Sequence, residues 1–203
     1  MKSTSLALAL AATIALAAAP ALAQPTPDIA KAEGGHFAVD KSHAKLIFSF
    51  NHFGYSTSYG LFSDFDAKLD LDPKTPAKSA LDVTVDMNHI DTFVPKLDAH
   101  MKSADMFDVA KFPTASFKST AIEVTGPATG KVTGNLTLHG VTKPVTLEAT
   151  LNGSGVNPVT KNYVVGFNAT ATLKRSDFGI SLYTPMVGDD VTLTISGEFI
   201  RQP

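Results

Sequence analysis

Six histidines and one strand-end arginine are the side chains of this 203-residue chain whose types could do chemistry. The histidines are His36, His43, His52, His89, His100 and His139. None of them stands in an HxH, HxxxH or HExxH spacing, the arrangements that place zinc ligands on one face of a strand or helix. The spacing therefore predicts no metal site, and ligands brought together from neighbouring strands stay open as the alternative.

Covalent catalysis has no recognisable sequence signal either. The chain has no cysteine, no G-x-S-x-G motif and no G-x-G-x-x-G motif after a predicted strand. Most aspartates alternate with apolar residues, which is typical of the solvated face of a sheet. We therefore expect no catalytic residues and no cofactor, and predict that the chain is not an enzyme.

Arg175 follows a long alternating segment and directly precedes Ser176 and Asp177. An arginine at such a place usually donates to a carboxylate or to phosphate oxygens. Two interpretations follow for Arg175 and Asp177, together with His52 and His100: a latch that closes the fold, or contacts to the head group of a ligand. The latch is favoured for Arg175, with Asp177 or a carboxylate near residues 95–103 as its partner.

Alternation with a period of two dominates the chain. Leu46, Phe48 and Phe50 alternate with polar residues, and the same pattern runs through segments 65–71, 81–87, 132–138, 145–151, 165–173 and 191–199. Such alternation predicts antiparallel strands with one face in water, and their number is about eight or nine. Long meandering strands in one all-β domain favour a closed antiparallel β-barrel over the alternative, a β-sandwich.

Breaks in the alternation predict the connections. Turn residues stand at 72–76, 125–127, 139–140 and 152–155. Segment 95–103, PKLDAHMKS, begins with a proline and holds helix formers, so one short helix is expected between strands. This helix is either a lid over one mouth of the barrel or a plain connection.

The apolar faces of the strands predict a ligand-lining interior. An eight-stranded barrel is either filled by side chains or holds one small ligand, and Ala67, Ala149 and Ala169 leave room among the larger residues. The predicted lining residues are Phe48, Phe50, Phe65, Val83, Val85, Phe117, Leu136, Leu138, Phe167 and Leu193.

The first 23 residues predict export. Lys2, the Ala- and Leu-rich run 6–19 and the A-x-A sequence ending at Ala23 form the pattern of a cleaved secretory signal peptide. Residues 24–35 are expected to form a flexible arm and 36–203 the barrel domain. The absence of cysteine excludes a disulfide framework and a lipidated cysteine, and bacterial periplasm is the expected location.

Charge excludes some partners. The formal net charge is −2, with no basic cluster, so nucleic acid is not expected as a partner. No second apolar stretch is long enough to span a bilayer, so stable membrane insertion is not expected. A homodimer stays open.

Seven motifs in order resemble the YceI-like family of polyisoprenoid-binding proteins. They are FAVDKSH (37–43), FNHFGYS with GLF (50–56, 60–62), IDT with DAHMKSADMFD (90–92, 98–108), FP with FKST (112–113, 117–120), GNLTLHGVTKPV (134–145), RSDFG (175–179) and VTL (191–193). The resemblance covers about residues 36–200. It implies a lipocalin-like barrel whose tunnel holds a polyisoprenoid or similar amphiphile, with no catalytic residues.

Two departures concern the helix segment. Leu97 stands where the family often has Arg, and Met106 where it often has Phe, so the resemblance does not imply that the helix contacts an anionic head group.

The favoured function is a periplasmic carrier for a polyisoprenoid, an isoprenoid quinone or a fatty-acyl lipid. The alternatives are a hydrolase or isomerase acting on a lipid at the barrel mouth, and a filled barrel acting as a stress or interaction module.

Overall fold

The computed structural model describes residues 25–203, and this range holds eleven strands and one α-helix. The predicted signal peptide and Gln24 lie outside the described residues. The strands are β1 (Gly35–Val39), β2 (Lys45–His52), β3 (Ser56–Phe62), β4 (Phe65–Leu71), β5 (Ala80–Asp86), β6 (Ile90–Asp91), β7 (Thr114–Val124), β8 (Thr129–Leu138), β9 (Val141–Val156), β10 (Tyr163–Lys174) and β11 (Val187–Arg201). The helix α1 spans Pro95–Lys102, between β6 and β7.

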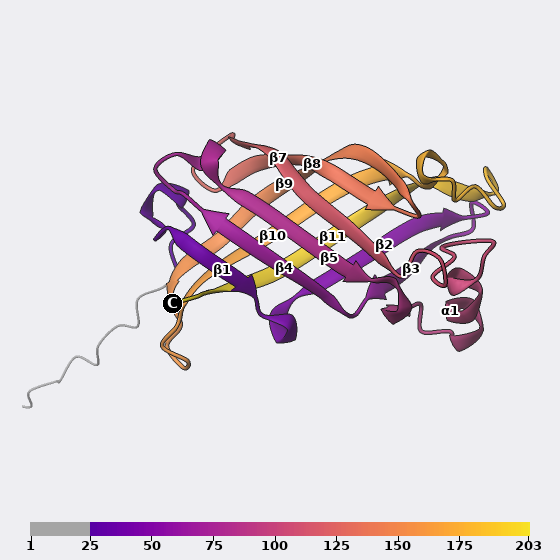
Figure 1. Cartoon of the computed structure of the whole chain (residues 1–203), viewed down its shortest axis with the longest axis horizontal. Helices are drawn as coiled ribbons and strands as arrows, with labels where there is room; N and C mark the ends of the chain where they lie inside the picture. Colours follow the sequence, from indigo (N-terminus) through magenta and orange to yellow (C-terminus); the bar gives the residue numbers. More distant parts are fainter. Residues whose placement is uncertain (1–24) are drawn as a thin grey trace, which may run out of the picture.

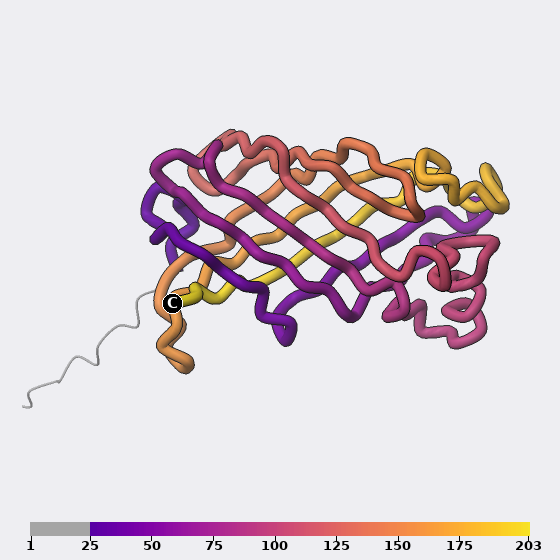
Figure 2. Tube along the Cα trace, in the orientation of Figure 1, coloured from indigo at the N-terminus to yellow at the C-terminus, as the bar shows by residue number. Residues whose placement is uncertain are grey.

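The strands form a closed antiparallel barrel. Eight of them, β1, β4, β5, β7, β8, β9, β10 and β11, pair in this order, and β1 pairs again with β11 to close the ring. Figures 1 and 2 show the strands tilted across the long axis of the molecule. This confirms the predicted all-β, lipocalin-like barrel of about eight strands, and closure removes the unpaired edges that a sandwich would leave.

The first three barrel strands are each divided into two. β1 and β2 both pair with β11 and are separated by the short 3₁₀-helix η2 (Lys41–His43). Two residues separate β3 from β4, and the 3₁₀-helix η4 (Met87–His89) separates β5 from β6. Because β2, β3 and β6 pair beyond the closed ring, the wall is extended at the end where α1 lies (Figure 1).

The helix lies at one end of the barrel, directly after β6 (Figure 1). The carboxylate of Asp98 accepts hydrogen bonds from the backbone N–H and hydroxyl of Thr92, at 2.7 and 2.6 Å, which fixes the start of α1 to β6. Met101 is buried and Leu97 packs beside it against the core. The predicted short helix is thereby confirmed. Among the described residues, no helix is both long and apolar enough to cross a lipid bilayer.

The opposite end is covered by residues that were expected to form a flexible arm. The backbone of Thr26 pairs with that of Ser154, and the N–H of Ile29 donates to the carbonyl of Pro127 at 2.9 Å. The side chain of Ile29 reaches the barrel interior. This part of the arm is therefore packed against the barrel.

The turn predicted at residues 152–155 is wrong. These residues lie within β9, and the chain reverses later, around Asn157, whose side chain accepts from the N–H of Val159 at 2.9 Å. A Cβ on Gly153 would lie 2.4 Å from Cβ of Pro25, so Gly153 makes room for the N-terminal segment. The glycine reflects a contact with a distant segment, which a local turn rule does not detect.

Candidate ligand-binding site

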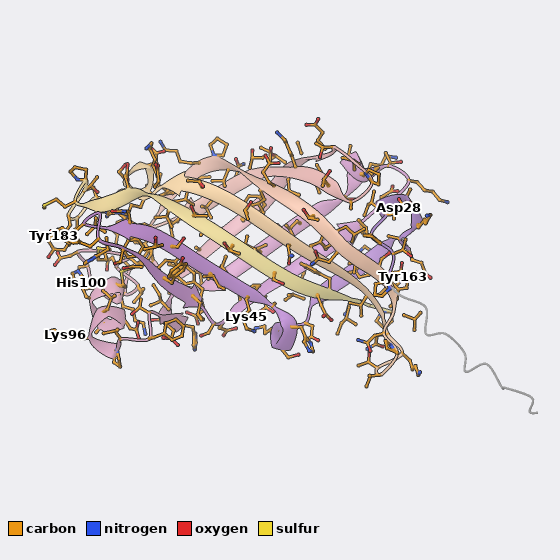
Figure 3. The ribbon with its side chains drawn as sticks, turned by 180° about the vertical axis from the view of Figure 1, so that it is seen from behind. Asp28, Lys45, Lys96, His100, Tyr163 and Tyr183 are labelled. Atoms are coloured by element: carbon orange, nitrogen blue, oxygen red, sulfur yellow. The ribbon has the colours of Figure 1, made fainter. Side chains whose placement is uncertain are left out.

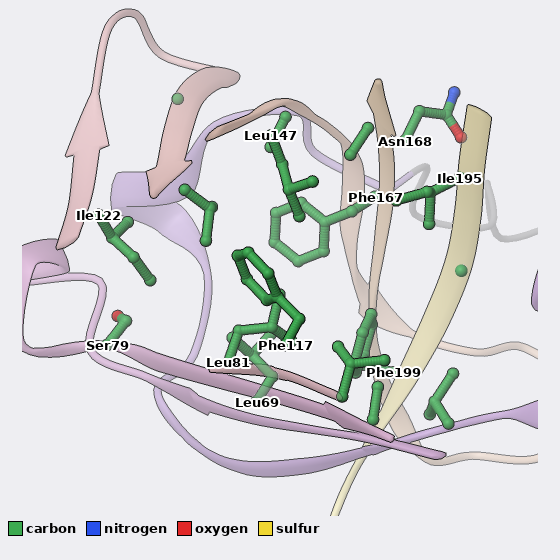
Figure 4. Close-up of a pocket in the computed structure, with 18 of the residues that line it drawn as sticks. Leu69, Ser79, Leu81, Phe117, Ile122, Leu147, Phe167, Asn168, Ile195 and Phe199 are labelled. Atoms are coloured by element: carbon green, nitrogen blue, oxygen red, sulfur yellow. The ribbon is translucent and has the colours of Figure 1, made fainter. Parts of the chain in front are cut away.

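The barrel interior contains a cavity of about 220 Å³ enclosed by side chains from most of the strands. The alternation directs one residue in two inward, so Phe117 on β7, Leu147 on β9 and Phe167 on β10 face the same space (Figure 4). Ile29, Pro76 and Glu123 lie at the end covered by the N-terminal segment. The wall is mostly hydrocarbon.

A second cavity of about 130 Å³ adjoins the first on the α1 side. Its own wall includes Phe48, Phe62, Met87, Met101 and Phe107. The two cavities share five wall residues: Leu46, Val85, Ala115, Leu136 and Leu193. The interior is therefore an elongated apolar space that runs between the two ends of the barrel.

Two glycines in the wall make room for aromatic rings. A Cβ on Gly60 would lie 2.3 Å from the ring of Phe48, and one on Gly134 would lie 2.4 Å from the ring of Phe117. Each ring thus lies over the glycine of a neighbouring strand, so it projects less far into the cavity. Neither glycine was predicted as part of the site, and the only signal was a glycine within an alternating segment.

Small residues open the middle of the wall. Ala149 on β9 and Ala169 on β10 are directly opposite each other in register, and both line the first cavity together with Ala67. All ten residues predicted to face the interior line one cavity or both: Phe48, Phe50, Phe65, Val83, Val85, Phe117, Leu136, Leu138, Phe167 and Leu193.

Arg175 is buried, 7% exposed, and lines the second cavity. Its guanidinium donates to three backbone carbonyls, those of Gly188 and Ile180 at 2.9 Å and of Val187 at 2.8 Å. The carboxylate partner predicted for Arg175 is wrong, because carbonyls of the chain that leads into β11 occupy the planar fork of donors. Burial lowers the pKa of Arg175, opposed by the charge of Asp189.

Asp177 lies away from this guanidinium. It is exposed, and its nearest cationic partner is Lys143, at 3.9 Å. The nearby carboxylate of Asp189 accepts from the N–H and hydroxyl of Ser176 at 2.9 and 2.8 Å. Burial pushes the pKa of Asp189 up, but these hydrogen bonds, together with the charges of Lys174 and Arg175, hold the pKa below its usual value. Arg175 and Asp189 thus both anchor the turn between β10 and β11.

The two histidines predicted with Arg175 lie at the α1 end of the barrel. His52 ends β2 and is exposed, with its ring 4.7 Å from that of Phe53. His100 is in α1, with its ring 6.4 Å from that of Tyr183. Neither lines the two cavities found in residues 25–203. The four predicted head-group or latch residues therefore do not form one cluster.

Carboxylates and histidines meet at the breaks in the first strands. Asp40, His43 and Glu198 form one group, and Asp64, Asp86 and His89 form a second, each with ligand atoms within 4.8 Å of one another. These are contacts across strands that sequence spacing does not predict.

Ordinary ion pairs account for both groups. Lys41 lies 2.9 Å from Asp64 and neutralises part of its charge. In the first group, hydrogen bonds from Ser42 and then His43 lower the pKa of Asp40 to about 2, and the hydrogen bond and charge of Asp40 raise the pKa of His43. Salt-bridge chemistry therefore suffices for both groups without an ion.

A closed eight-stranded barrel around an elongated apolar space defines a lipocalin-like class of barrel protein. The chain belongs to the YceI-like family, because the model of the YceI-like domain matches residues 37–199. It is 42% identical over 174 residues to a UPF0312 protein of Pseudomonas aeruginosa, covering 85% of this chain and 90% of the relative. It is 41% identical over 173 residues to Protein YceI of Salmonella arizonae, covering 84% and 90%.

Solved structures share the fold. BcnA of Burkholderia cenocepacia has a TM-score of 0.72 at 26% identity, covering 79% of this chain and 98% of that one. A polyisoprenoid binding domain from Saccharophagus degradans has a TM-score of 0.62, covering 84% and 100%. At 11% identity, the second likeness concerns the fold alone.

Proposed function

We propose that the protein holds one long apolar amphiphile, of the polyisoprenoid, isoprenoid-quinone or fatty-acyl type, along the axis of the barrel. The observation that carries this proposal is the pair of adjoining apolar cavities, of about 220 and 130 Å³. Burying about ten CH₂ groups contributes roughly 8 kcal/mol before ordering costs, which is on the order of micromolar binding. The polyisoprenoid binding domain from Saccharophagus degradans shares this barrel fold, so the fold is compatible with a ligand of this class.

The lining of the cavities favours binding and release over catalysis. Among the described wall residues, the mostly hydrocarbon surface offers no paired nucleophile and base for a hydrolase or isomerase. The free space argues against a filled barrel that serves only as an interaction module. We accordingly propose a carrier, and turnover of a bound lipid would instead support an enzyme.

We further propose that the carrier works in the periplasm after cleavage of the signal peptide. The proposal is supported by the order of Lys2, the apolar run 6–19 and Ala23 in the sequence. N-terminal sequencing of exported protein should begin at Gln24. Met1 retained in a membrane fraction would contradict export.

A cavity-filling variant tests the proposed function. Ala169 faces Ala149 across two strands of the cavity wall, so Ala169→Leu puts three more carbon atoms into the space. Thr170 is exposed on the outer face of the same strand, and Thr170→Leu is the matched control. Native mass spectrometry with lipid extraction should find a lipid on the wild type and on the control, and little on Ala169→Leu. Equal occupancy of all three proteins would place the lipid outside the barrel and contradict the proposal.

A further inference from the structure

Exposed apolar side chains gather at the α1 end of the barrel. We name as the apolar rim Phe53, Tyr55, Phe93, Val94, Tyr183 and Met186, all of them exposed. The N–H of Phe53 donates to the carbonyl of Met186 at 2.9 Å, which ties two parts of the rim together. Figure 3 shows Tyr183, His100 and Lys96 at one end of the molecule and Asp28 and Tyr163 at the other.

Three aromatic residues of the rim have a left-handed backbone. Their φ angles are 55° at Phe53, 63° at Phe93 and 62° at Tyr183. Bulky side chains rarely adopt this conformation, which suits glycine or asparagine. Phe93 is 70% exposed and Tyr183 is 52% exposed. Burial of these side chains therefore does not offset the strain in their backbone. Strain kept without a packing reason indicates a functional role for these rings.

The rim is also free of charged side chains over long stretches. Segments 53–63 and 178–188 contain no Asp, Glu, Lys or Arg, in a chain of which 18% is charged. The opposite end carries ion pairs, such as Lys31 with Asp28 and Arg201 with Glu33. The α1 end has ion pairs as well, Lys174 with Asp190 and Lys143 with Asp177. The two uncharged segments around Phe53 and Tyr183 are therefore the parts of this end that suit an uncharged apolar environment.

The segments that carry the rim also close the second cavity. Met101 of α1 lines the cavity, while Phe93 and Val94, just before α1, are exposed. Ile180 and Val187 line it on the other side, and Tyr183 lies between them in sequence and is exposed. Each segment thus separates the cavity from the outside.

We propose that the apolar rim docks on the surface of a lipid bilayer, so that the α1 end of the cavity faces the lipid from which ligand enters. The inference rests on the proposed lipid-binding function. Aromatic rings are favoured at the interface between hydrocarbon and headgroups, and the uncharged segments 53–63 and 178–188 can approach uncharged lipid headgroups. A second copy of the chain on the rim would cover the end through which ligand enters.

Vesicle flotation tests the docking surface. The double variant Phe93→Asn with Tyr183→Asn removes two rings, and asparagine fits the left-handed backbone, so the melting temperature should stay equal or rise. Val159 is 85% exposed, outside the rim, in the turn between β9 and β10, so Val159→Asn is the matched control. On phosphatidylcholine vesicles, the double variant should partition at least about ten-fold more weakly than the wild type, and the control within about two-fold of it.

Three results would overturn the docking proposal: no vesicle binding by the wild type, equal binding by the double variant, or loss of a dimer in the double variant on analytical ultracentrifugation. Lipid extraction of the same samples separates docking from the proposed function. Lipid inside a wild type that does not bind vesicles overturns docking alone. An empty protein that binds vesicles supports docking and overturns only the proposed function.

Discussion

The buried guanidinium of Arg175 gives the sharpest prediction about stability. It donates to the carbonyls of Ile180, Val187 and Gly188 at 2.8–2.9 Å, and these residues lead from the end of β10 back into β11. Arg175→Ala removes all three donors at once. We expect the variant to lose stability whether or not a ligand is present.

The magnitude follows from how far water can replace each donor. A hydrogen bond to a charged group contributes about 1.5–3 kcal/mol, less the cost of burying the guanidinium. Ile180 is only 2% exposed, so water cannot reach its carbonyl readily. Val187 and Gly188 are partly exposed, so water can donate to their carbonyls in place of the missing guanidinium. The expected loss of unfolding free energy is about 3–5 kcal/mol, which lowers the melting temperature by roughly 6–20 °C.

Urea unfolding of ligand-free protein, followed by far-ultraviolet circular dichroism, measures this loss. Lys174→Ala is the control, because Lys174 is the adjacent residue but its ion pair with Asp190 is exposed. Its unfolding midpoint should match the wild type. The unfolding midpoint of Arg175→Lys should lie between those of the wild type and Arg175→Ala, since an ammonium group cannot place donors in the planar arrangement of a guanidinium. A wild-type midpoint for ligand-free Arg175→Ala would refute the reasoning and favour the ligand-contact interpretation.

Two further predictions concern the cavity wall and the response to acid. Phe50 lines the second cavity with its ring 6.3 Å from that of Phe48, so Phe50→Asp buries an unpaired carboxylate and should cost about 3 kcal/mol or more in urea unfolding. Asn51→Asp, on the exposed face, should leave the free energy of unfolding nearly unchanged. A Phe50→Asp variant as stable as the wild type would mean that Phe50 does not face the barrel interior. Asp40 has its pKa lowered from 3.8 to about 2 by Ser42 and then His43. Its stabilisation should therefore be present above pH 3.8 and lost as the pH falls toward 2, so that Asp40→Asn and the wild type converge in stability there. A stability difference that does not change between pH 5 and pH 2 would contradict the assignment.

Alternation predicted the barrel because it reports directly which face of a strand is buried. Phe48 and Phe117 were predicted to face the interior, and both line it. The breaks at η2 and η4 were not predicted. At η4 the alternation of segment 81–87 continues to Met87, the first residue of the break, which is itself buried. A sequence pattern of inward residues does not reveal where the backbone leaves the ladder.

Long-range contacts explain what the sequence did not predict. Gly153 was read as a turn residue because nothing local indicates its contact with Pro25. Arg175 was assigned a carboxylate partner because side-chain charges are visible in a sequence. Backbone acceptors are not visible in this way, and the carbonyls of Val187 and Gly188 lie 12 and 13 residues further along the chain.

A photoreactive isoprenoid alcohol, with a diazirine at the end of its chain, tests most directly whether the ligand lies inside the barrel. After irradiation and digestion, mass spectrometry of the peptides identifies the residues that carry the adduct. We predict adducts on inward-facing wall residues such as Phe117 and Phe167, and loss of these adducts in Ala169→Leu. Adducts on outward-facing residues such as Thr170, unchanged in Ala169→Leu, would contradict a ligand held in the barrel.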